Sequence, residues 1–133
     1  MSQYIPGQVW TYRARPGEER SYLTILRVED DPTLGEIVHV RVDGLKMQSR
    51  HAPGGVNPTI THMPLSATAL DESVVLQFRT APVPEFAEGY RLWSEATAAG
   101  RGGIFGVPVA ECVAAMERAL NSPDGPANGN SGS

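Results

Sequence analysis

The sequence has one cysteine and no long apolar run, and each absence removes a class of protein. The single cysteine, Cys112, excludes an internal disulfide framework and a cysteine-rich zinc module. No stretch approaches the roughly 18 consecutive apolar residues of a membrane-spanning helix, so we expect no membrane partner. The first residues lack the basic start and apolar run of a secretory signal, so a cytoplasmic protein is expected.

A basic surplus is also missing, because the formal net charge is -4. Residues 1–60 are balanced, whereas residues 61–133 hold four arginines against eight acidic residues. Nucleic-acid-binding proteins usually carry an excess of positive charge that displaces counterions from phosphates. The charge balance therefore disfavours a nucleic acid as partner.

The length and composition are those of one folded domain. The chain has 133 residues, of which 41% are hydrophobic and 20% charged. A chain of this length buries about two thirds of its extended surface on folding, enough for a hydrophobic core without staples. We expect a single domain over residues 1–121. Residues 122–133 contain no large apolar side chain and are predicted to form a disordered tail.

The N-terminal half has the pattern of β-strands. Residues 8–14, 21–29 and 36–42 are rich in β-branched and aromatic side chains and are separated by turn residues, which predicts an antiparallel meander. In the third strand, the side chains of Val38, Val40 and Val42 share one face, which should be core. Apolar residues on both faces of the second strand indicate a sheet covered on both sides, as in a curled sheet or small barrel.

The C-terminal half has the pattern of helices. Phe86, Tyr90 and Trp93 fall on one helical face, and Leu70, Val74 and Phe78 repeat at four-residue spacing. The three predicted helices span residues 66–79, 85–98 and 109–121. The fold class predicted is therefore α+β, with a three- or four-stranded antiparallel meander followed by three helices.

Residues 48–60 are predicted to be a loop, because they contain two prolines and two consecutive glycines. A loop of this length in a compact domain is often functional or partly mobile. Both interpretations, a functional lid and a merely mobile segment, stay open.

Several short segments carry a resemblance to a family. They are PGQVWTY at residues 6–12, RPGEE at 15–19, HMPLS at 62–66, FAEGY at 86–90 and PVAE at 108–111. Together they resemble a group of small bacterial proteins without an assigned function. The resemblance covers residues 5–120 and implies a bacterial origin and a single domain. It brings no catalytic residue, ligand or partner with it.

The histidines are the first candidates for chemistry. His39 lies mid-strand on the face that carries Arg41 and Asp43, and it could act as a general base near neutral pH if that face lined a cleft. The alternative is a partly exposed strand histidine. His62 is expected to hydrogen-bond loop backbone, with a functional role as the alternative. His51 is expected to be solvated, and no histidine pair has the helical spacing of a zinc site, so no metal is expected.

Other motifs are weak. Cys112 lies near a predicted helix start but shares its apolar face with Val109 and Val113, which indicates a buried, unreactive thiol. No phosphate-binding loop follows Gly54 and Gly55, and no Gly-x-Ser-x-Gly motif occurs. No cofactor is therefore expected.

The aromatic side chains offer one further site. Tyr90 and Trp93 are expected in the core with the other large aromatic residues. If they were exposed instead, they would be good anchors for a protein partner.

These observations favour a non-catalytic protein that binds another protein or self-associates. The acidic second half suggests a docking surface for a basic partner. The alternative is a small enzyme or small-ligand binder that uses the face of His39, Arg41 and Asp43 and is closed by residues 48–60. A nucleic-acid-binding module that uses the strand arginines is a third, weaker hypothesis.

Overall fold

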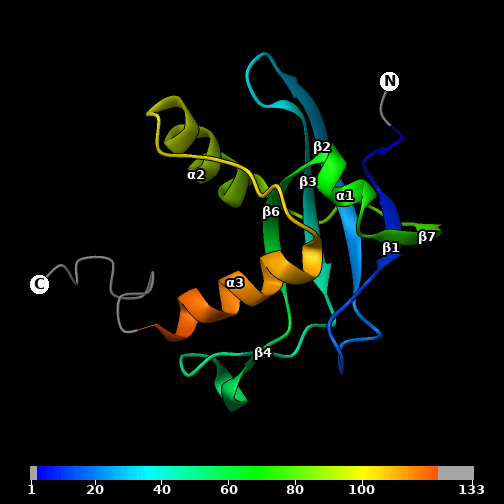
Figure 1. Cartoon of the computed structure of the whole chain (residues 1–133), viewed down its shortest axis with the longest axis vertical. Helices are drawn as coiled ribbons and strands as arrows, with labels where there is room; N and C mark the ends of the chain where they lie inside the picture. The colour runs from blue at the N-terminus through cyan, green and yellow to red at the C-terminus, as the bar shows by residue number, and fades with distance from the viewer. Residues whose placement is uncertain (1–2, 123–133) are drawn as a thin grey trace, which may run out of the picture.

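The computed structural model describes residues 3–122, which form one five-stranded antiparallel sheet with helices on both faces (Figure 1). The strand order is β6-β3-β2-β1-β7. The bounds are β1 Gln8–Tyr12, β2 Tyr22–Asp31, β3 Gly35–Asp43, β6 Ile60–Ser66 and β7 Val74–Thr80. The α+β class is confirmed. The sheet has five strands instead of the three or four predicted, and it is not closed into a barrel.

The alternation in β3 separates the two faces of the sheet. Val38, Val40 and Val42 are fully buried in the main core, as predicted. The neighbouring strand, β2, pairs with β3. The register of this pair shifts between Ile25 and Arg27, so that Arg27 pairs with His39. The side chain of His39 therefore points to the face opposite the valines.

The helices cover these two faces separately. Helix α3, Val109–Asn121, contributes Val109, Cys112 and Val113 to the core on the valine face, where the short helix α1, Ala67–Asp71, also packs. Helix α2, Ala87–Ala98, lies on the His39 face and has no fully buried residue. Both α2 and α3 lie close to their predicted bounds. No helix among residues 3–122 is long and apolar enough to cross a membrane.

The predicted helix over residues 66–79 is wrong in its second half. Ser66 caps α1 by accepting a hydrogen bond from the Ala69 N–H, but the helix ends at Asp71 and β7 begins at Val74. Ser73 fixes this ending, because its hydroxyl donates to the Ala69 carbonyl and accepts from the Val109 N–H. The residues after Ser73 then pair with β1.

The predicted loop over residues 48–60 contains more structure than expected. β4, Met47–Gln48, pairs with β5, Val56–Asn57, around a short 3-10 turn at Pro53–Gly55, and β6 begins at Ile60. Met47 is buried in the core, so the hairpin base is anchored to the domain. The predicted tail beyond Ser122 lies outside the described residues.

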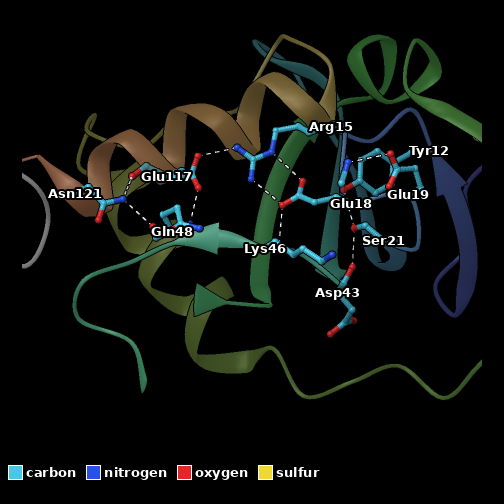
Figure 2. A network of polar contacts seen from close by, with 11 residues as sticks. Tyr12, Arg15, Glu18, Glu19, Ser21, Asp43, Lys46, Gln48, Glu117 and Asn121 are labelled. Carbon is cyan, nitrogen blue, oxygen red and sulfur yellow. Dashed lines mark hydrogen bonds and ion pairs between the residues drawn. The ribbon is translucent and has the colours of Figure 1, made fainter. Parts of the chain in front are cut away.

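An arginine joins the N-terminal turn to the last helix. The Arg15 guanidinium donates two hydrogen bonds to Glu18, at 2.8 and 2.7 Å, and one to Glu117 of α3 at 2.8 Å (Figure 2). Glu18 is buried and also accepts from the Lys46 N–H. Arg15 lowers the pKa of the Glu18 and Glu117 carboxyls, so both acids are held in their charged form.

Candidate functional site

A chain of three polar side chains runs between the sheet and α2. Nε2 of His39 lies 2.6 Å from Oε2 of Glu29, and Nδ1 of His39 lies 2.8 Å from Nε2 of His62. The residues come from three neighbouring strands, β2, β3 and β6. The side chain of His39 is 0% exposed, so both of its ring nitrogens are satisfied inside the protein.

The donors and acceptors along this chain follow from Glu29. A carboxylate oxygen can only accept, so Nε2 of His39 carries the hydrogen in their shared bond. A neutral His39 then has an unprotonated Nδ1, which accepts from the Nε2–H of His62. The second carboxylate oxygen of Glu29 accepts from the Tyr90 hydroxyl at 3.2 Å.

Burial keeps both imidazoles neutral near pH 7. It lowers the pKa of His39, although the hydrogen bond to Glu29 acts in the opposite direction. The pKa of His62 is lowered to about 4, first by burial and then by the neighbouring His39. Two neutral rings that share one hydrogen bond stabilise this packing, whereas two charged rings would repel each other.

Helix α2 covers the chain with aromatic side chains. The rings of Tyr90 and Trp93 lie edge-on to His39, with centroids at 5.1 and 4.8 Å. The Arg27 guanidinium lies over the Tyr90 ring, 4.8 Å from the ring centroid. Trp93 also donates to the Gly103 carbonyl at 2.8 Å, which ties α2 to the segment that follows it. His39 is therefore closed off from solvent.

The remaining predicted site residues do not converge on His39. Arg41 donates to Asp43 at 3.0 and 3.2 Å, and Asp43 also accepts from the Thr59 hydroxyl. For His62 we expected loop backbone as the partner, and the structure places its Nε2 against Nδ1 of His39 instead. His51 is exposed. Among residues 3–122, no three His, Cys, Asp or Glu side chains are placed to hold a metal ion.

Tyr90 and Trp93 are half-buried and pack against His39. The predicted aromatic core is divided by the sheet. Trp10 and Tyr12 belong to the valine-face core, whereas Tyr90 and Trp93 cover the opposite face. Cys112 is fully buried, as expected, and burial raises its pKa to about 12.

A pocket of about 400 Å³ opens beside this cluster. The connector between β7 and α2 supplies Val83, Pro84, Glu85 and Phe86, and the sheet and α2 supply Arg27 and Tyr90. The walls are mostly apolar, with one guanidinium and one carboxylate. His39 is not part of the lining, because Tyr90 lies between it and the pocket.

Besides the pocket, the outer edge of β7 is a second candidate binding surface. In the described part of the chain, β7 pairs with β1 alone, and it lies on the side of the sheet away from α2 and α3 (Figure 1). Its apolar side chains are unusually exposed: Val75 at 61%, Leu76 at 59% and Phe78 at 44%. An exposed apolar edge strand is a template for pairing with another chain.

The opposite edge of the sheet is covered near the C-terminal end of β6. Phe105 forms a parallel bridge with Leu65 of β6, its N–H donating to the Pro64 carbonyl and its carbonyl accepting from the Ser66 N–H. Pro64 further removes one backbone donor from β6. The β6 edge is thus covered around Leu65, whereas the β7 edge, although bulged at Val75 and Phe78, has no second strand paired to it among the described residues and exposes apolar side chains.

Sequence reasoning missed Glu29 and the whole of β7 as site elements. Arg27 and Glu29 alternate onto one face of a predicted strand, which was the available signal for Glu29. The signal for β7 was the pair of β-branched residues Val74 and Val75, followed by Phe78 at strand-compatible spacing. The four-residue spacing of its apolar residues indicated a helix instead.

Comparisons of the chain with family models, with curated proteins and with solved structures found no match.

Proposed function

We propose that this chain is a non-catalytic protein that works by binding another protein chain along the open edge of its sheet. The observation that carries the proposal is the difference between the two edges. β6 is bridged at Leu65 by the backbone of Phe105 and contains Pro64, whereas β7 exposes Leu76 and Phe78. Natural sheets usually protect their edges with charges, prolines or covering segments.

The site chemistry supports binding over catalysis. His39 is the best-placed general base in the sequence, but both of its ring nitrogens are occupied and no solvent reaches it. A general base must come within hydrogen-bond reach of the proton that it removes. The Glu29–His39–His62 chain therefore serves to fix α2 on the sheet.

The proposal is tested with a pair of matched substitutions. Leu76→Lys places a charge on the open edge, and Leu92→Lys places one at a similarly exposed position of α2, where the leucine is 54% exposed. We expect association with a protein, whether another chain or a second copy, to be lost in Leu76→Lys and kept in Leu92→Lys. Association that is equal in the two variants, or absent from the native chain, contradicts the proposal.

A second candidate is small-ligand binding, which the pocket beside Arg27 favours. Its mostly apolar walls, with one guanidinium and one carboxylate, are the usual composition of a small-molecule site. A fragment screen by nuclear magnetic resonance tests it: ligands of this pocket should shift the signals of Phe86 and Tyr90. Binding should weaken in Phe86→Ala and not in Leu92→Ala. A screen without such shifts removes this candidate.

A further inference from the structure

We propose that the partner of β7 is a second copy of this chain, whose own β7 pairs antiparallel across a two-fold axis at Gln77. The inference rests on the proposed function, since it names the chain that occupies the open edge. A two-fold axis brings the same surface of both copies together, so one exposed strand satisfies another without a further component.

In antiparallel pairing about Gln77, the apolar side chains of the two β7 strands lie on the same face of the sheet. Leu76 pairs with Thr11, and the Phe78 ring packs on Tyr22 with centroids at 6.2 Å, so both side chains lie on one face of the sheet. Gln77 pairs with Trp10 on the other face. A two-fold axis at Gln77 therefore places Leu76 of each copy opposite Phe78 of the other. Apolar cross-strand pairs of this kind stabilise antiparallel sheets.

The charges of β7 also favour a second copy. Arg79 is the one charged residue of this strand, and its guanidinium lies over the rings of Tyr22 and Phe78. In the register about Gln77 it faces the uncharged Val75 of the other copy, so no like charges meet. The basic partner that the net charge suggested would instead bring a second positive charge beside Arg79, which is unfavourable.

The geometry of β7 limits how strong the pairing is. Its register against β1 shifts at Val75 and again at Phe78, which are the positions of two bulges. Bulges twist a strand and interrupt its ladder, so the new pairing extends over only the few residues from Val75 to Arg79, which include both bulge positions. A small interface of this kind is typical of weak association.

A cysteine on the two-fold axis tests the register. Residues directly opposite each other in an antiparallel pair have Cα atoms about 4.5–5.5 Å apart, within the range of a disulfide. Cys112 is buried, so Gln77→Cys supplies the accessible thiol. We expect mild oxidation to give a covalent dimer for Gln77→Cys. The exposed control Leu92→Cys should remain monomeric, and the double variant Gln77→Cys with Leu76→Lys should cross-link much less.

The native chain is examined in parallel by sedimentation velocity from about 5 to about 500 μM, a range chosen for a weak interface. We expect the mean sedimentation coefficient to rise with concentration, and Leu76→Lys to stay monomeric while its circular dichroism spectrum remains native. Because Leu76 is exposed, this variant should fold, and the Gln77→Cys result does not depend on it.

The outcomes separate this inference from the proposed function. A native chain that stays monomeric, with no cross-linking of Gln77→Cys beyond that of Leu92→Cys, overturns the second copy as the occupant. If Leu76-dependent binding of a different protein is then observed, the proposed function stands and this inference fails. If no Leu76-dependent association of any kind occurs, both fail.

Discussion

Gly89 of α2 packs directly against His62 of β6: a Cβ built on Gly89 would lie 2.8 Å from the Cβ and 3.2 Å from the Cγ of His62. Real Cβ atoms do not approach this closely. The glycine therefore sets how near α2 comes to the sheet, and it lies one residue before Tyr90, which covers His39.

Gly89→Ala should destabilise the protein even though alanine is the better helix former. Helix propensity alone predicts a gain of about 1 kcal/mol. The added methyl group must instead push α2 away from His62, and we expect a net loss of about 1–2 kcal/mol in the free energy of unfolding. Urea denaturation measures it, with Leu92→Ala on the exposed face of α2 as control. A variant more stable than the native chain contradicts the close packing.

Stability should fall as the pH decreases from about 6.5 towards 4. The pKa of His62 is about 4 in the folded protein and near 6.5 in the unfolded chain, so the unfolded chain takes up its proton first. The lowered pKa of His39 acts in the same direction. The loss from one such group is at most about 1.4 kcal/mol per pH unit within this window, and the full stability is present above pH 6.5.

His62→Gln isolates this effect, because the Gln amide can still donate to Nδ1 of His39 but does not titrate. Urea denaturation at pH 7.5 and pH 5 should show a smaller pH dependence for this variant than for the native chain. His51→Gln changes an exposed histidine and should leave the pH dependence as it is in the native chain. An equal pH dependence in native chain and His62→Gln would show that the buried pair does not govern it.

Glu18→Gln should destabilise the joint between the N-terminal turn and α3. Glu18 is 3% exposed and receives two hydrogen bonds from Arg15 and one from the Lys46 N–H (Figure 2). The amide replaces one acceptor with a donor that faces the guanidinium, so we expect a loss of about 1–3 kcal/mol. Thermal unfolding at pH 7 measures it.

Glu19→Gln is the matched control for this joint. Glu19 is the next residue along the chain, but its carboxylate is bound by backbone N–H groups in an exposed turn, Gly17 among them, and not by Arg15. We expect its unfolding temperature to stay within about two degrees of the native value, since surface changes usually cost less than about 0.5 kcal/mol. Equal losses in the two variants would show that the contact with Arg15 contributes little.

The central meander was predictable because its signals are local. Val38, Val40 and Val42 alternate with polar residues in one continuous segment, and Gly35 ends the preceding turn with a φ of 80°. Each signal lies within a few residues of the feature that it specifies. The same alternation predicts that the His39 side chain lies on the face opposite the valine core, as it does in the structure.

The outer strands depend on partners that are distant in the chain. The apolar spacing of Leu70, Val74 and Phe78 suits a helix, but Val74 pairs with Tyr12 and Gln77 with Trp10. Pairing of this kind across more than sixty positions overrides local propensity. Nothing in the local sequence around residue 74 shows that the edge of β1 is available to it.

The same limit applied to the candidate site. His39 could be placed on a face, but its partner His62 lies on β6, a strand that the loop-like composition before Pro64 concealed. The register of β6 against β3, with a shift between Val40 and Val42, decides which β6 side chain reaches His39. The hydrogen bond between these two histidines, 23 positions apart, therefore depends on a pairing that no local pattern shows.

Cys112 should be unreactive in the folded protein. Its thiol is fully buried on the inner face of α3 and donates to the Val107 carbonyl at 3.3 Å. Burial raises its pKa to about 12, so almost no thiolate forms at pH 8, and the thiolate is the form that reacts. Labelling with iodoacetamide should therefore proceed only through unfolding. It should be complete within minutes in denaturing urea, and Leu92→Cys, which adds an exposed thiol, should be labelled once per chain under native conditions. Rapid native labelling of Cys112 itself would mean that α3 opens from the sheet far more often than a core helix should.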